Sequence, residues 1–199
     1  MKIGPMFKLG VILAAFATAA CVGLAFVYAG TAEVIAVRAK ADLEAALKDL
    51  FPLADDFRAV SAPLESGVST VTFDAAYDIY RDGALIGVVI RVTGPGFNGP
   101  IVTLTGVRAD GTLAGAKILE HTDTPGLGAN AASPKYFVDK AKGLTFMGQY
   151  AGKSVTDAFE VRADIIPITA ATITSRGLSG AVRAAGKAGS AYLAARGGK

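Results

Sequence analysis

The chain has 199 residues, which is enough for one domain of ordinary size and an appendage. Its hydrophobic share of 52% is high for a wholly soluble protein, and its net charge of +3 is too small and too dispersed to indicate nucleic-acid binding. A single Cys and a single His exclude an intrachain disulfide and a metal site of the Cys/His-rich kind.

Residues 1–30 are predicted to form a membrane anchor, because from Leu9 onward they contain no charged side chain. A helix of that length, at about 1.5 Å per residue, crosses a hydrocarbon core of about 30 Å. A cleaved signal peptide has a shorter apolar region of about 7–15 residues, so we predict one uncleaved span. Lys2 and Lys8 favour a cytoplasmic N-terminus, although basic residues also follow the span. We expect a single-pass inner-membrane protein whose C-terminal domain is periplasmic.

Residues 31–67 are predicted to form a helical stalk and a loop. Apolar residues recur at helical spacing as far as Phe51, where Pro52 ends the pattern. The segment that follows, 55–67, has the composition of a loop. A folded domain is then expected over residues 68–199.

Short turn sequences divide the first half of this domain into strands. Asp82-Gly83 and Asp110-Gly111 each predict a β-hairpin. The predicted strands are 77–80, 85–92, 101–107 and 113–120. The Gly/Pro-rich stretch 93–100 is interpreted as a tight connection between strands, because it has neither the ending of a P-loop nor the strand–loop–helix setting of a Rossmann fingerprint.

Two helices are predicted to flank the sheet. Ser133 can cap a helix from Lys135 to Lys142, and Ser179 or a nearby residue is expected to open a final helix from Gly180 to Ala195. Antiparallel strands with segregated helices define the α+β class. The expected architecture is a single N-terminal transmembrane helix followed by an antiparallel-sheet domain with flanking helices.

Three threonines and a serine lie between Thr169 and Ser175, just before the predicted final helix. The first N–H groups of a helix lack internal partners and its dipole favours negative charge, so this stretch is a candidate anion or phosphate site. The alternative is a capping region, since Thr and Ser cap helices well. A Thr hydroxyl is a poor nucleophile without a base. Thr172 therefore fits a modified acceptor better than a catalyst.

The second candidate is the stretch Thr124-Pro125-Gly126-Leu127-Gly128. One interpretation is an ordinary turn, with Pro and Gly in their preferred positions. The other is a binding surface for an aromatic cofactor, in which the glycines leave the backbone uncovered and the leucine packs on the ring. His121 lies beside Glu120 and Asp123 in the sequence, but adjacency does not establish contact. We assign His121 no catalytic role.

Taken together, these motifs resemble a known family. The matching stretches are Gly94–Ile101, Gly106–Gly111, Glu120–Gly128 and Thr169–Ser175, within a similarity that runs from about Tyr77 to Ser190. Their order and separation are similar to those of the G subunit of the Rnf ion-translocating electron transport complex. A more distant resemblance is to the C subunit of the Na⁺-pumping NADH:quinone reductase. Both families carry an FMN-binding domain of the covalently flavinylated type.

The resemblance implies specific cofactor contacts. The family's attachment motif is Ser/Thr-Gly-Ala-Thr, whose last Thr carries FMN through a phosphoester, and this implies Thr172 as the acceptor. The other implied cofactor-binding residues are Thr169, Ala170, Ala171, Ile173, Thr174, Ser175, Thr124, Pro125, Gly126, Leu127 and Gly128. The chain departs from the family at Ala170, which replaces the Gly, and at Ile166, where an Asp usually stands six residues before the acceptor.

The implied function is that of a membrane-anchored flavoprotein electron carrier, a subunit of a Na⁺- or H⁺-translocating oxidoreductase complex with covalent FMN. The resemblance implies no catalytic side chain and no metal. Expected partners are other membrane, iron–sulfur and flavin subunits, a flavin transferase for maturation, and membrane lipid, but no nucleic acid. Two alternatives stay open. One is a membrane-anchored binding or assembly module of the same fold without flavin; the other is a Thr- or Ser-dependent hydrolase, which requires His121 or a Lys as base.

Overall fold

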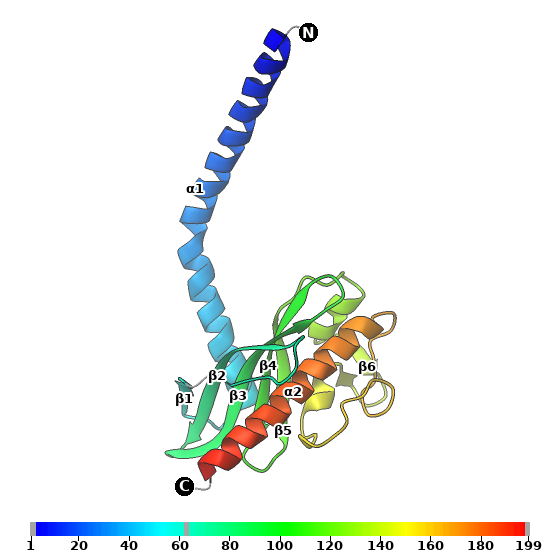
Figure 1. Ribbon diagram of the computed structural model, residues 1–199. Coiled ribbons are helices and arrows are strands. Elements are labelled where there is room, and N and C mark those ends of the chain that lie inside the picture. Colours follow the sequence, from blue (N-terminus) through cyan, green and yellow to red (C-terminus); the bar gives the residue numbers. More distant parts are fainter. Residues whose placement is uncertain (1–2, 62–63, 198–199) are drawn as a thin grey trace. The chain divides into compact units, whose positions relative to one another are not determined.

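The computed structural model describes residues 3–61 and 64–197 (Figure 1). The chain divides into two compact units, Met1–Leu43 and Glu44–Lys199. Helix α1 runs from Ile3 to Leu50, so its last turns belong to the second unit. The helix predicted as far as Phe51 is confirmed as part of α1, and it ends just before Pro52, as expected from the missing N–H of proline.

Helix α1 is long and apolar enough to cross a membrane, and its most apolar window is not buried within the protein. Its large apolar side chains are exposed, among them Phe7, Phe16, Leu24 and Phe26. Exposure of apolar area to water is unfavourable by about 25 cal/mol per Å². A hydrocarbon environment removes this cost, so the helix has the properties of a membrane anchor.

The second unit contains a five-stranded antiparallel sheet in the order β1-β2-β3-β4-β5. The strands are Asp56–Ala59 (β1), Thr72–Arg81 (β2), Ala84–Pro95 (β3), Pro100–Arg108 (β4) and Leu113–Glu120 (β5). The hairpin turns predicted at Asp82-Gly83 and Asp110-Gly111 are confirmed, and Asp82, Gly83 and Gly111 adopt the positive φ such turns require. The predicted loop 55–67 is wrong in part, because β1 lies within it and pairs with β2.

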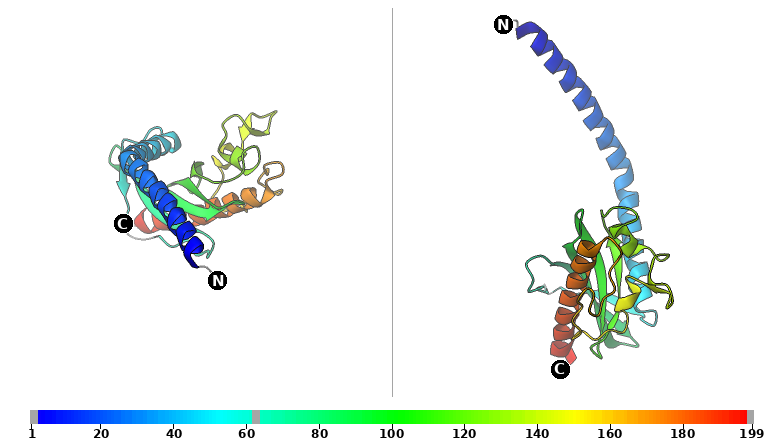
Figure 2. Two further views of the ribbon diagram at one scale, coloured as in Figure 1. Left: turned by 90° about the horizontal axis from the view of Figure 1, so that it is seen from above. Right: turned by 90° about the vertical axis from the view of Figure 1, so that its right-hand side faces the viewer.

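Both faces of the sheet are covered. Helix α2 (Thr172–Gly197) lies along one face, as the right-hand view of Figure 2 shows, and packs against β3, where Val88 and Ile90 are fully buried. Phe51 packs on the opposite face, where a Cβ added to Gly87 would lie 2.7 Å from its ring. Burial on both faces explains why β3 is a nearly continuous apolar run.

Between β5 and α2 the chain forms only short elements. They are the 3-10 helices η1 (Gly128–Ala132) and η2 (Gly148–Tyr150) and the hairpin of β6 (Phe137–Asp139) and β7 (Leu144–Thr145). The predicted helix Lys135–Lys142 is therefore wrong. The Asp139 carboxylate accepts hydrogen bonds from the N–H groups of Ala141 and Lys142, and Gly143 turns the chain at φ +62°. Such local side-chain bonds favour a turn over a helix.

Helix α2 begins at Thr172, not at Gly180 as predicted. Its first turn is closed by Ser175, whose N–H and hydroxyl both donate to the carbonyl of Ala171, at 3.0 and 2.9 Å. The Ser175 hydroxyl also accepts the N–H of Ile168 at 3.0 Å. The second part of the Thr-rich stretch, Thr172–Ser175, thus forms the first turn of the helix instead of preceding it. The sequence did not predict this turn because Thr, Ser and Gly have weak helix propensity. In the structure, the buried contacts of the turn stabilise the helix despite that propensity.

Candidate functional site

A pocket of about 300 Å³ lies where the first turn of α2 meets the loop that follows β5. It is lined by Phe97, Asp123, Thr124, Leu127, Gly128, Ala170, Ala171, Thr172, Ile173 and Thr174. These residues come from the β3–β4 connection, the loop after β5 and the start of α2. The pocket is therefore built from segments that lie far apart in the sequence.

Asp123 joins the three segments. Its side chain is only 5% exposed. Oδ1 accepts the backbone N–H groups of Phe97 and Asn98 at 3.0 and 2.9 Å, and Oδ2 accepts the Thr174 hydroxyl at 2.6 Å. A Cβ added to Gly128 would lie 2.3 Å from Oδ2, so only glycine fits there. The carboxylate thus fixes the pocket wall on three sides.

Thr172 lies at the pocket wall as the first residue of α2 and is half-buried. Among the described residues, its hydroxyl has no hydrogen-bond partner and the N–H groups of Thr172, Ile173 and Thr174 have no backbone acceptor. Open N–H groups at a helix N-terminus attract anions. A hydroxyl and a set of donors are therefore available to a phosphate group at one end of the pocket.

The other parts of the pocket wall are apolar. Phe97, Leu127 and Ile173 line the pocket, yet their side chains are 67%, 41% and 58% exposed. Large apolar side chains gathered around a pocket mark a binding surface more often than chance exposure. A flat aromatic ring would cover them, so the pocket fits a ligand with a planar apolar part and a phosphate.

The pocket contains most, but not all, of the residues predicted for the site. Those that line it are Thr124, Leu127, Gly128, Ala170, Ala171, Thr172, Ile173 and Thr174; those outside its wall are Thr169, Pro125, Gly126 and Ser175. Gly126 shapes the turn at φ +79°, and Ser175 is buried in the first turn of α2. The predicted site omitted Phe97 and Asp123, which both line the pocket. The available signal was that both lie in stretches that resemble the family, Gly94–Ile101 and Glu120–Gly128.

Comparison with known proteins decides the family. Residues 96–187 match the FMN-binding domain and residues 1–50 match the RnfG N-terminal region. The G subunit of the ion-translocating oxidoreductase complex of Cereibacter sphaeroides is 33% identical over 195 residues, covering 91% of this chain and 82% of the relative. The chain belongs to the RnfG family, the G subunits of ion-translocating oxidoreductase complexes.

A second relative agrees with membership of the RnfG family. The G subunit of the Na(+)-translocating ferredoxin:NAD(+) oxidoreductase complex of Acetobacterium woodii is 32% identical over 197 residues, covering 89% of this chain and 88% of the relative. Among solved structures, Shewanella oneidensis NqrC is similar with a TM-score of 0.48 and 20% identity over 73% of each chain. The residues that line the pocket all lie within the matched FMN-binding domain.

The turn that leads into α2, residues 168–171, is strained at Ala170. This residue adopts φ +61°, the left-handed region in which a Cβ costs roughly 1–2 kcal/mol. It is also the position at which the family motif has Gly. This chain therefore adopts at position 170 a conformation that glycine would take without the strain.

We expect Ala170→Gly to raise the free energy of unfolding by about 0.5–1 kcal/mol, because glycine relieves the strain but loses more entropy on folding. Ala171→Gly is the matched control, since its φ is negative and glycine there should destabilise by up to about 1 kcal/mol. Urea unfolding of the two variants in detergent measures both changes. If the Ala170→Gly variant is no more stable than the parent, the backbone at position 170 is not strained.

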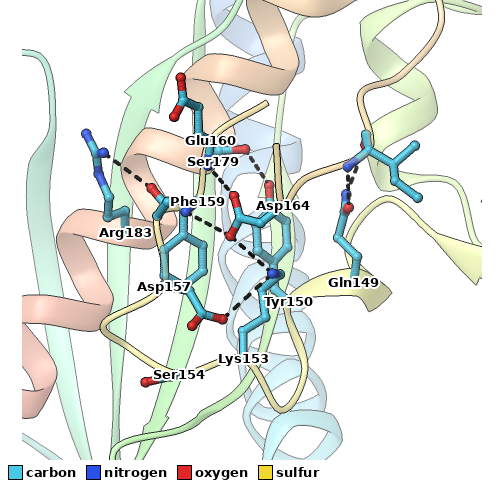
Figure 3. Close-up of polar contacts among 12 residues, drawn as sticks. Gln149, Tyr150, Lys153, Ser154, Asp157, Phe159, Glu160, Asp164, Ser179 and Arg183 are labelled. Carbon is cyan, nitrogen blue, oxygen red and sulfur yellow. Dashed lines mark hydrogen bonds and ion pairs between the residues drawn. The ribbon is translucent and has the colours of Figure 1, made fainter. Parts of the chain in front are cut away.

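Gln149 and Asp164 organise the segment that leads into the turn before α2 (Figure 3). The Gln149 side-chain amide pairs with the backbone of Ile166, donating to its carbonyl at 3.2 Å and accepting its N–H at 2.9 Å. The Asp164 carboxylate accepts the N–H groups of Phe159 and Glu160, at 3.0 and 2.6 Å, and pairs with Lys153 at 3.1 Å. The Asp164 carboxylate therefore bonds within its own loop. Ile166, which stands where the family usually has Asp, is 40% exposed.

The pKa of Asp164 lies below its usual range. Burial raises it, but hydrogen bonds from the Glu160 N–H, Lys153 and the Phe159 N–H lower it by more. A carboxyl with a depressed folded pKa contributes stability that is present above its unfolded pKa, about 4, and lost as the pH falls through the folded pKa.

We expect Asp164→Asn to cost about 1–3 kcal/mol at pH 7, because the amide replaces a charged acceptor of three donors. The stability gap between parent and variant should stay constant from pH 8 to about pH 5 and narrow below about pH 4. Urea unfolding at a series of pH values measures it. A gap that does not change with pH would show that the charge of Asp164 has no role.

Proposed function

We propose that this RnfG-family protein is a membrane-anchored electron carrier whose FMN is bound through a phosphoester to Thr172. The observation that carries the proposal is the pocket itself. It brings to one place the Thr172 hydroxyl and the first N–H groups of α2, which have no partner within residues 3–61 and 64–197, and the apolar side chains of Leu127 and Ile173. The match to the FMN-binding domain spans all of these residues.

The residues present fit the two halves of FMN. The hydroxyl and first N–H groups of α2 would hold the phosphate, where the helix dipole stabilises negative charge. Phe97, Leu127 and Ile173 would contact the isoalloxazine ring. FMN, when bound, supplies one- and two-electron transfer, and the protein contributes attachment, orientation and tuning of the potential.

Among the described residues, no base is hydrogen-bonded to the Thr172 hydroxyl, as activation of a nucleophile would require. Its hydroxyl has no hydrogen bond among the described residues, and His121 does not line the pocket. The Nδ1 atom of His121 is itself buried and has no hydrogen-bond partner among the described residues. This favours an acceptor modified by a separate flavin transferase over a Thr-dependent hydrolase.

Helix α1 would hold the carrier at the bilayer, with the FMN-binding domain on the periplasmic side and the basic N-terminus in the cytoplasm. The relatives are named as subunits of ion-translocating oxidoreductase complexes. By the same relationship, the partners of this chain are the other membrane, iron–sulfur and flavin subunits of such a complex. A covalent bond keeps the cofactor in place where the dissolved flavin is dilute.

Intact mass of the purified full-length chain, produced together with a flavin transferase, tests the proposal. The expected result is a chain heavier by one FMN residue, with a yellow colour that remains after denaturation. An unmodified and colourless chain overturns the electron-carrier function and supports instead a binding or assembly module of the same fold.

A further inference from the structure

Asp123 is a buried charge with no cationic partner. Among residues 3–61 and 64–197, no Lys, Arg or His lies within ion-pair distance of its carboxylate. Its three donors, the N–H groups of Phe97 and Asn98 and the hydroxyl of Thr174, are all neutral. Hydrogen bonds from neutral donors offset the cost of burial but leave the net charge in place.

The charge lies at the wall of the proposed cofactor pocket. Asp123 lines that pocket, and Gly128, on which a Cβ would lie 2.3 Å from Oδ2, places no side chain beside the carboxylate. In such a partly desolvated site an electrostatic interaction is stronger than in water. A fixed negative charge there disfavours the extra negative charge that a cofactor gains on reduction.

We propose that Asp123 is a positioning residue of the flavin site, which joins the three pocket segments and holds the midpoint potential of the bound flavin below the value that a neutral residue would give. This inference rests on the proposed function. Asp123 was not among the residues predicted to bind the cofactor. The inference gives it two separate roles: it holds the pocket segments in place, and its charge affects the potential.

The test compares Asp123→Asn with Thr174→Val in the full-length flavinylated protein. Asparagine has the same shape and still accepts the N–H groups of Phe97 and Asn98, but carries no charge. Valine removes the hydrogen bond from Thr174 to Oδ2 and leaves the charge. Spectroelectrochemical titration gives the midpoint potential, while visible absorbance and thermal unfolding give flavin content and stability.

We expect Asp123→Asn to raise the midpoint potential and Thr174→Val to leave it close to the parent value, although both lower thermal stability. An unchanged potential in Asp123→Asn, or equal shifts in both variants, overturns the inference. If Asp123→Asn holds no flavin, Asp123→Glu decides. Recovery of flavin at the parental potential supports the role of the charge, and no recovery shows that Asp123 is only structural. A parent protein that binds no flavin overturns the proposed function instead.

Discussion

Thr172→Ala is expected to abolish covalent flavin completely. The phosphoester requires a hydroxyl at the start of α2, and Thr172 lies there with its hydroxyl free of hydrogen bonds in the described part of the chain. The change removes one half-buried hydroxyl and leaves the Asp123–Thr174 contact intact. In-gel flavin fluorescence after denaturation, together with intact mass, measures the loss.

A control variant and a stability measurement separate attachment from folding. Thr70→Ala removes an exposed hydroxyl that lies outside the pocket wall and outside the attachment motif, and it should keep full fluorescence. Thr172→Ala should also melt within a few degrees of the parent, since substitutions that create no cavity and break no contact change stability by about 0.5 kcal/mol or less. Fluorescence that persists in Thr172→Ala would identify another acceptor and refute the assignment.

Local turn chemistry made much of the sheet predictable. Asp82-Gly83 and Asp110-Gly111 predicted both hairpins because few residues other than Gly, Asn and Asp adopt positive φ easily. The apolar run of β3 and the proline after Phe51 likewise depend on neighbours in the sequence. Features of this kind are encoded within a few residues and need no tertiary information.

Features that depend on distant contacts were not predictable in the same way. The role of Asp123 is visible only once the β3–β4 connection and α2 come together, since its partners Asn98 and Thr174 lie 25 and 51 residues away. The start of α2 at Thr172 was also missed, because its first turn is stabilised by tertiary burial. Thr172 itself was proposed from family resemblance, and nothing in its local pattern distinguished it from a helix cap.

Gly177→Ala is expected to be the most damaging single-methyl change in the domain. A Cβ on Gly177 would lie 1.8 Å from the carbonyl oxygen of Pro95, at the end of β3. Backbone atoms cannot yield as a flexible side chain does, so α2 would have to move away from the sheet. Overpacking of this kind typically costs 1–3 kcal/mol and occasionally more, and we expect about 3 kcal/mol here. For a unit of this size the melting temperature should fall by about 6–12 °C.

Gly180→Ala is the matched control, because it lies one turn further along the same helix and a Cβ there meets no atom within 4 Å. Alanine is favoured over glycine within a helix by about 1 kcal/mol, so this variant should melt about 2–4 °C above the parent. If the same Gly→Ala change lowers the melting temperature at position 177 and raises it at position 180, the close approach of α2 to Pro95 is the cause of the destabilisation. Because Thr172 and Thr174 lie on the first turn of that helix, Gly177→Ala should also reduce flavin content, whereas Gly180→Ala should not. Equal effects in the two variants would show that the contact with Pro95 does not determine where the pocket wall lies.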